Sequence, residues 1–247
     1  MDRDPFFIIG AQRSGTTYLY ELLDEHPSVS MAKPKRPEPK WFLDPQKIKL
    51  GGEAWRKTLF PGVSKGLLGE KGTSYLEHPE AADSILSVFP KAQFIAILRE
   101  PFARAVSNYR FSVENKSEAL PIEQALNLQA LNRPFDPKKY SVSPYAYLQR
   151  GRYIDYLEPW AARVPRSNFH VMLLEELVAG REALDELCRF LKIGLFQPKG
   201  MDRIVNAAAE PIPEIPEGLR VILMEYFREP NARLAGFLGK PLDIWGP

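Results

Sequence analysis

Four short, unbroken apolar runs constrain the fold of this chain more than any other feature of its sequence. They occupy residues 6–9, 66–69, 93–98 and 169–174. Continuous rather than alternating hydrophobicity is typical of parallel strands that are covered on both faces. Segments with helical spacing lie between these runs, at residues 17–25, 79–88 and 101–113. The alternation predicts an α/β fold in which helices flank a central, mostly parallel sheet.

Length and composition favour a single domain. The chain has 247 residues, of which 45% are hydrophobic and 26% are charged, and both fractions are ordinary for a globular protein. We therefore expect one domain over residues 1–247. A helical pattern broken by prolines at 120–157 predicts a helical cap insertion, and a further helix is expected at 216–238.

The same data exclude several classes of protein. The single cysteine, Cys188, excludes an internal disulfide framework and a cysteine-rich metal site, and we expect a buried thiol. No apolar run approaches the ~18–20 residues that cross a membrane, and no secretion signal is recognisable, so we expect a cytoplasmic protein. A net charge of only +2 argues against a protein that coats nucleic acids.

A glycine-bearing turn joins the first apolar run to the first helical segment. Its sequence, Gly-Ala-Gln-Arg-Ser-Gly-Thr-Thr, covers residues 10–17. A strand, a turn and a helix in this order present backbone N–H groups to an anion. The spacing is similar to G-x-x-x-x-G-K-[ST], but Thr16 stands where that pattern has its triphosphate-binding lysine, and the nearest cation is Arg13. We therefore expect a phosphate site that serves neither ATP nor GTP.

A second anion-binding element is expected at the end of the third apolar run. Arg99 follows that run, at the edge where open α/β sheets bind ligands. Ser107 comes eight residues later, and two helical turns return its hydroxyl to the same edge. A guanidinium fork and a hydroxyl together suit one phosphate group.

Taken in order, these segments resemble the sulfotransferases that use 3′-phosphoadenosine 5′-phosphosulfate (PAPS). The similarity is to the branch that contains heparan sulfate sulfotransferase domains and many bacterial sulfotransferases. Residues 7–17 resemble its 5′-phosphosulfate loop, and residues 98–109 resemble its 3′-phosphate element. Other similar segments are 69–76, 151–153 with Trp160, 168–177, 231–234 and 238–239.

The resemblance implies a P-loop-like fold and a bacterial-type sulfotransferase that needs no metal. Such an enzyme transfers a sulfuryl group from PAPS to an acceptor by in-line displacement; a hydroxyl is the first expectation for the acceptor group and an amine the second. The acceptor would be a carbohydrate, a lipid or a secondary metabolite. The cap at 120–157 would shape part of the pocket that binds it. The residues implied to bind PAPS are Gln12, Arg13, Ser14, Gly15, Thr16 and Thr17 around the 5′-phosphate, and Arg99 and Ser107 around the 3′-phosphate.

The resemblance also implies three catalytic residues. Arg13 stands where the family usually has lysine, and because arginine keeps its proton at neutral pH its role would be electrostatic. Glu38, in a Glu-Pro-Lys-Trp-Phe segment, is the nearest match to the branch's general base, although Pro37 replaces the lysine before it. Lys71 would contact the leaving phosphate or the acceptor. Another branch of the family uses a histidine as its base, but His26, His78 and His170 of this chain rank below Glu38.

Other interpretations stay open. Glu38 could merely offset the lysines of the basic, proline-rich stretch at 33–40, and Lys71 could be a solvated surface amine. A P-loop kinase of small molecules is one alternative function, which the missing lysine at Thr16 disfavours. A non-catalytic protein that binds nucleic acid or another anion through the stretch at 33–40 is the other, which the low net charge disfavours. The sequence leaves the oligomeric state open.

Overall fold

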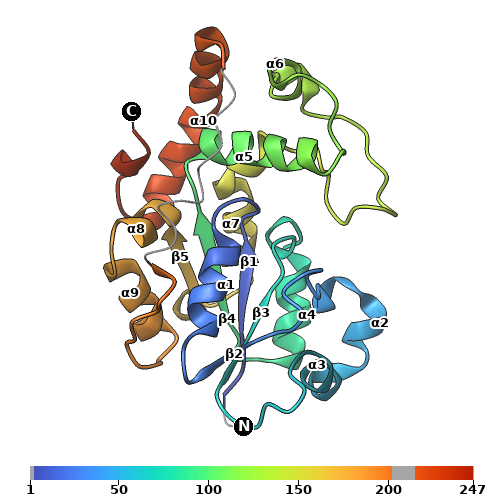
Figure 1. Cartoon of the computed structure of the whole chain (residues 1–247), viewed down its shortest axis with the longest axis vertical. Coiled ribbons are helices and arrows are strands. Elements are labelled where there is room, and N and C mark those ends of the chain that lie inside the picture. Colours follow the sequence, from blue (N-terminus) through green and yellow to red (C-terminus); the bar gives the residue numbers. More distant parts are fainter. Residues whose placement is uncertain (1–2, 202–214, 247) are drawn as a thin grey trace.

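The computed structural model describes residues 3–201 and 215–246, and it confirms the α/β architecture (Figure 1). Five strands form one sheet in the order β2-β3-β1-β4-β5, and every neighbouring pair is parallel. The strands are β1 (Phe6–Gly10), β2 (Val29–Met31), β3 (Leu67–Lys71), β4 (Gln93–Leu98) and β5 (Phe169–Leu173). Because β1 is central, the turn that follows it lies in the middle of one sheet edge.

Ten α-helices are described around this sheet. They are α1 (Thr16–Asp24), α2 (Pro45–Ile48), α3 (Gly51–Leu59), α4 (Glu80–Val88), α5 (Pro101–Glu114), α6 (Ile122–Ala125), α7 (Tyr153–Ala161), α8 (Leu174–Ala179), α9 (Glu182–Phe190) and α10 (Glu217–Leu238). None of the described helices is long and apolar enough to cross a membrane. Helix α10 runs beside α7 and α5 on one side of the molecule (Figure 1).

Alternate side chains of the central strand enter two different cores. Phe7 and Ile9 of β1 pack with apolar residues of α3, α4 and α7 on one face. Phe6 and Ile8 pack with those of α1, α8 and α9 on the other face, where Cys188 is fully buried as expected. Both faces of the sheet are therefore covered, which explains why its strands read as unbroken apolar runs. A third cluster joins α5 and α6 to the first half of α10.

The carboxyl ends of the strands gather the segments that the sequence singled out. Ile8 of β1 is level with Lys71 at the end of β3, and Gly10 is level with Ala96 of β4. The turn after β1, the end of β3 and Arg99 after β4 therefore share one edge of the sheet. In an open α/β sheet this edge, next to the strand where the winding reverses, is where ligands bind.

Helix α5 places Ser107 over that edge. Glu100 caps the helix, because its carboxylate accepts hydrogen bonds from the backbone N–H groups of Phe102 (2.8 Å) and Ala103 (2.5 Å). Pro101 occupies the first helical position, where its missing N–H costs nothing. A capping interaction of this kind stabilises a helix by about 1 kcal/mol. The start of α5 is thus fixed directly after the strand that carries Arg99.

Two parts of the fold differ from the sequence expectations. Strand β2 has only three residues, and a run this short gives no usable periodicity. The helical pattern predicted over 120–157 resolves into the short helix α6, two 3-10 turns and irregular chain up to residue 152, and α7 begins at Tyr153. The prolines at 134, 137 and 144 explain the difference, because each removes a backbone donor from a helix interior.

Candidate functional site

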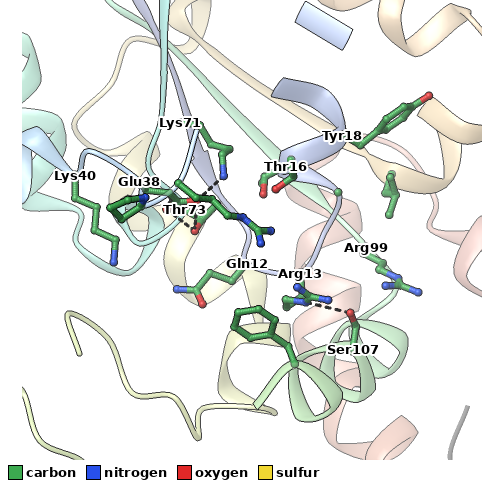
Figure 2. A pocket seen from close by; sticks show the side chains of 16 residues that line it. Gln12, Arg13, Thr16, Tyr18, Glu38, Lys40, Lys71, Thr73, Arg99 and Ser107 are labelled. Atoms are coloured by element: carbon green, nitrogen blue, oxygen red, sulfur yellow. Dashed lines mark hydrogen bonds and ion pairs between the residues drawn. The ribbon is translucent and has the colours of Figure 1, made fainter. Parts of the chain in front are cut away.

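A cavity of about 670 Å³ lies at the carboxyl edge of the sheet. Figure 2 shows the side chains that line it, and they come from five separate segments of the chain: 12–18, 36–40, 71–73, 99–111 and Leu174. The lining residues are Gln12, Arg13, Gly15, Thr16, Thr17, Tyr18, Arg36, Pro37, Glu38, Lys40, Lys71, Thr73, Arg99, Ser107, Phe111 and Leu174. Nearly all of the residues that the resemblance singled out therefore meet in one place.

The turn after β1 holds an unusual backbone conformation. Arg13 and Gly15 both have positive φ angles, 66° and 85°. A side chain at Gly15 would be strained at that φ, and its Cβ would lie 2.5 Å from Leu174 Cδ1. Gly15 precedes the first residue of α1 and no side chain caps that helix, so the first N–H groups of α1 are available to an anion.

Arg13 is held by two contacts from helix α5. Its Nε donates a hydrogen bond to Ser107 Oγ at 3.2 Å, and its guanidinium carbon lies 4.7 Å from the centre of the Phe111 ring. Burial lowers the pKa of Arg13, and the charges of Arg36 and Arg99 lower it further, while Glu114 raises it. Arginine stays charged despite such shifts, so the cavity contains a fixed positive charge.

Two further guanidinium groups, those of Arg36 and Arg99, line the same cavity. Within residues 3–201 and 215–246, none of Arg13, Arg36 and Arg99 forms an ion pair. Three cations that repel one another around one cavity, without a paired carboxylate, are costly unless an anion binds between them. The cavity is therefore built for a strongly anionic ligand.

Glu38 and Lys71 form a separate ionic group on the opposite wall. Lys71 Nζ donates a hydrogen bond to Glu38 Oε1 at 2.6 Å. The Lys71 side chain is only 3% exposed and the Glu38 side chain 15%. Thr73 donates to the same carboxylate through its backbone N–H, at 2.8 Å from Oε2, and through its hydroxyl. Three donors use about three of the four acceptor positions of a carboxylate, which leaves one for a further donor.

A fully buried carboxylate, Glu70, anchors both members of this group. It accepts hydrogen bonds from Trp55 Nε1 and from the Tyr75 hydroxyl, each at 2.5 Å, and burial raises its pKa. Glu70 immediately precedes Lys71 in β3. It also accepts from the backbone N–H of Trp41 at 3.4 Å, three residues after Glu38. One buried group thus positions the lysine and the loop that carries its partner.

Gln12 lies between the two walls (Figure 2). Its Nε2 donates to Glu77 Oε1 at 3.3 Å, and the same oxygen accepts from Arg150 Nε at 2.7 Å. Arg150 also donates to Asn108, the residue after Ser107 in α5. The turn after β1 and α5 are therefore connected through Glu77 and Arg150 as well as through Arg13.

The remaining candidate residues lie outside the cavity. Ser14 does not line the cavity: its side chain is fully buried and faces the hydroxyl of Tyr153. None of the three histidines lines the cavity either, and His170 is packed against Phe190, as expected for a strand residue. In the described part of the chain, no three His, Cys, Asp or Glu side chains gather where they could hold a metal ion.

Several lining residues escaped the sequence analysis. Thr73 lies two residues beyond the end of β3, and this position at a carboxyl edge is a signal that could have identified it. Phe111 lies four residues after Ser107 and therefore on the same face of α5. Arg36 and Lys40 belong to the basic stretch at 33–40, whose contribution to a cavity depends on how the loop folds back.

Comparisons with known proteins identify similar chains. A family model described as a sulfotransferase domain matches residues 3–209. Human bifunctional heparan sulfate N-deacetylase/N-sulfotransferase 3 is 26% identical over 276 residues, covering 99% of this chain and 31% of that protein. Human heparan sulfate glucosamine 3-O-sulfotransferase 6 is also 26% identical, over 97% of this chain and 72% of its own length. The chain thus spans about a third of the length of the bifunctional relatives that it matches.

Solved structures share the same fold. A sulfotransferase from Alicyclobacillus acidocaldarius superposes with a TM-score of 0.81 and 23% identity, covering 100% of both chains. The sulfotransferase domain from the curacin biosynthetic pathway gives a TM-score of 0.54 at 17% identity over 97% of this chain and 99% of that one. At these identities the likeness supports the architecture of the chain and nothing finer.

Proposed function

Because the chain belongs to the sulfotransferase domain family, we propose that it transfers a sulfuryl group from PAPS to a hydroxyl group of an acceptor. The observation that carries this proposal is the set of three guanidinium groups without ion-pair partners in the described chain, Arg13, Arg36 and Arg99, around one cavity. PAPS carries a phosphosulfate at its 5′ end and a phosphate at its 3′ end. Its charge would relieve the repulsion between the arginines.

The two ends of PAPS have separate candidate partners. The N–H groups at the start of α1, together with Thr16, Thr17 and Arg13, would bind the 5′-phosphate. Arg99, which extends from the end of β4, would bind the 3′-phosphate with Ser107. Ser107 already accepts a hydrogen bond from Arg13, so the two sites share a residue at their boundary.

When bound, PAPS supplies the sulfuryl group: a bond forms from the acceptor oxygen to sulfur while the bond from sulfur to the 5′-phosphate oxygen breaks. Arg13 would stabilise the negative charge that develops on the leaving oxygen, since a fixed cation at that point favours the transition state over the ground state. Glu38 would accept the proton of the attacking hydroxyl through its remaining acceptor position. Lys71 and Thr73 would hold that carboxylate in place.

We propose a carbohydrate hydroxyl as the first acceptor to test. Both relatives named above are heparan sulfate sulfotransferases by their descriptions, one an N-sulfotransferase and the other a 3-O-sulfotransferase, and the second description favours a hydroxyl. The loop at 36–40 contributes Pro37 and Lys40 beside Glu38, a mixture of polar and apolar surface that suits a hydroxyl-rich molecule.

A thermal-shift comparison tests the donor. A ligand at 100 times its Kd stabilises the folded state by about 2.7 kcal/mol, which is roughly 5–10 °C for a chain of this size. Adenosine 3′,5′-bisphosphate (PAP) should raise the Tm by that amount, whereas ATP with Mg²⁺ should not. Arg99→Ala should remove most of the shift, and Arg228→Ala, an exposed arginine on α10, should keep it. A shift with ATP and Mg²⁺ alone would replace this proposal with a kinase.

A further inference from the structure

The hydroxyl of Tyr153 lies between the two elements to which we assign the phosphates. Tyr153 is the first residue of α7, and only 1% of its surface is exposed. The hydroxyl donates a hydrogen bond of 2.6 Å to the backbone oxygen of Arg99. The same oxygen atom lies 3.4 Å from Ser14 Oγ in the turn after β1, and 3.4 Å from the backbone N of Arg99. One side-chain atom thus touches both elements.

The peptide group between Arg99 and Glu100 is held at both of its polar atoms. Its oxygen accepts from Tyr153, and its N–H donates to Glu175 Oε1 at 2.8 Å. Trp245 Nε1 fixes the other oxygen of Glu175 at 2.9 Å. A peptide held in this way cannot rotate, so the direction in which the Arg99 side chain leaves the strand is set by its neighbours.

Ser14 makes the link to the other element. Its side chain is completely buried, and its hydrogen bond to Tyr153 is the contact that connects the turn to α7. Ser14 lies between Arg13 and Gly15, the two residues with positive φ. A movement of this hydroxyl therefore moves the backbone that would bind the 5′-phosphate.

We propose that the Tyr153 hydroxyl is a positioning group that keeps the 5′-phosphate and 3′-phosphate sites at the separation required by one nucleotide. This inference rests on the proposed use of PAPS. A ligand with two anionic ends gains full affinity only if both sites are preorganised at the right distance, because otherwise part of the binding energy is used to bring them together. Tyr153 does not line the cavity, so it acts through Arg99 and Ser14.

The chemistry of the hydroxyl agrees with this role. Burial raises the pKa of Tyr153 to about 12, so the group keeps its proton at neutral pH and can donate to the Arg99 oxygen. A role in packing alone would need only the ring, which lies 6.0 Å from the Trp245 ring. Phenylalanine keeps the ring and removes the hydroxyl, so Tyr153→Phe separates the two roles.

The test compares ligands that engage one site or both. We would measure the Kd of PAP and of adenosine 5′-monophosphate (AMP), which lacks the 3′-phosphate, by calorimetry. The ratio of the AMP Kd to the PAP Kd reports how much the 3′-phosphate adds once the 5′-phosphate is bound. In Tyr153→Phe this ratio should fall 5- to 10-fold, while AMP alone weakens less than 3-fold. Ser14→Ala, which breaks the longer contact from the other side, should lower the ratio by a smaller factor.

Tyr20→Phe is the matched control. Tyr20, one turn into α1, is 2% exposed, and its hydroxyl donates to the backbone oxygen of Ala32 at 2.9 Å and accepts from Lys33, not from Ser14 or Arg99. It should leave the ratio unchanged even if its Tm falls as much as that of Tyr153→Phe. An unchanged ratio in both Tyr153→Phe and Ser14→Ala, or an equal fall in Tyr20→Phe, would overturn the inference. If the parent protein binds PAP no better than AMP, the proposed donor itself is wrong.

Discussion

Replacing Glu38 by glutamine tests the proposed base and the buried ion pair together. The substitution keeps the shape of the side chain but removes its charge and turns one acceptor oxygen into a donor. Lys71 is 3% exposed and Glu38 is 15% exposed, at an N–O distance of 2.6 Å. Removing one member of a buried pair costs about 3–5 kcal/mol, and the partial exposure of Glu38 favours the lower end. At roughly 2–4 °C per kcal/mol in a chain of this length, the Tm should fall by about 6–12 °C.

The same substitution should slow the reaction by about 10²–10⁴-fold, the usual contribution of a general base, while PAP affinity stays within a factor of about three. We would follow transfer of ³⁵S from labelled PAPS to the acceptor that the parent enzyme uses fastest, the Tm by calorimetry, and PAP binding by titration. A second variant, Glu38→Gln with Lys71→Met, separates the two effects. It removes the isolated ammonium, so most of the lost stability should return, but the rate should not.

Two results would refute this reasoning. If Glu38→Gln is as fast as the parent, the proton goes to another group and Glu38 is not the general base. If the double variant is no more stable than Glu38→Gln, the lost stability does not come from the unpaired lysine. The second result would leave the chemistry untouched and would direct attention to the contacts of Thr73 with the carboxylate.

Three further outcomes are expected. Arg13→Ala should lower kcat by about 10²–10³-fold and weaken PAP binding by less than tenfold, since its charge acts mainly on the leaving oxygen; unchanged turnover would contradict the assignment. Thr73→Val should reduce kcat about tenfold without altering PAP affinity, and Thr73→Ser should restore it. His170, whose pKa burial lowers from 6.5 to about 4, is neutral when folded, so stability present above pH 6.5 should be lost as the pH falls to 4, by up to about 3 kcal/mol. The Tm of His170→Phe should fall less than that of the parent between pH 7 and 4.5.

The sheet could be predicted from the sequence because its strands are buried on both faces. Such strands are unbroken apolar runs, and all four of the predicted ones are present. Strand β2 was missed because three residues carry no period. The stretch at 120–157 was predicted as mainly helical because its apolar residues are spaced for a helix. Its prolines interrupt that helix, and most of the stretch before Tyr153 is irregular chain.

The site was predictable where local sequence determines geometry. The turn after β1 and the Arg99–Ser107 element follow strands directly, so their place at the sheet edge follows from topology. The partner of Lys71 was not predictable in this way, because Glu38 is 33 residues distant and reaches it through a loop that Glu70 anchors. From the sequence, Tyr153 was noted as part of the similar segment 151–153, and its buried hydroxyl became informative only when its two neighbours were known.

The pairing of Glu38 with Lys71 keeps this carboxylate from neutralising the arginines that line the same cavity. A carboxylate near three arginines would ordinarily pair with one of them and reduce the anion affinity of the cavity. Here the charge of Glu38 is matched by Lys71 at 2.6 Å and its orientation is fixed by Thr73, so Arg13, Arg36 and Arg99 keep no ion pair within the described residues. The proposed chemistry needs this separation, because an anionic donor and a proton acceptor must be present in the same cavity. The Lys71–Glu38 pair therefore does more than stabilise a loop: it would let the proposed base and the proposed anion site lie side by side.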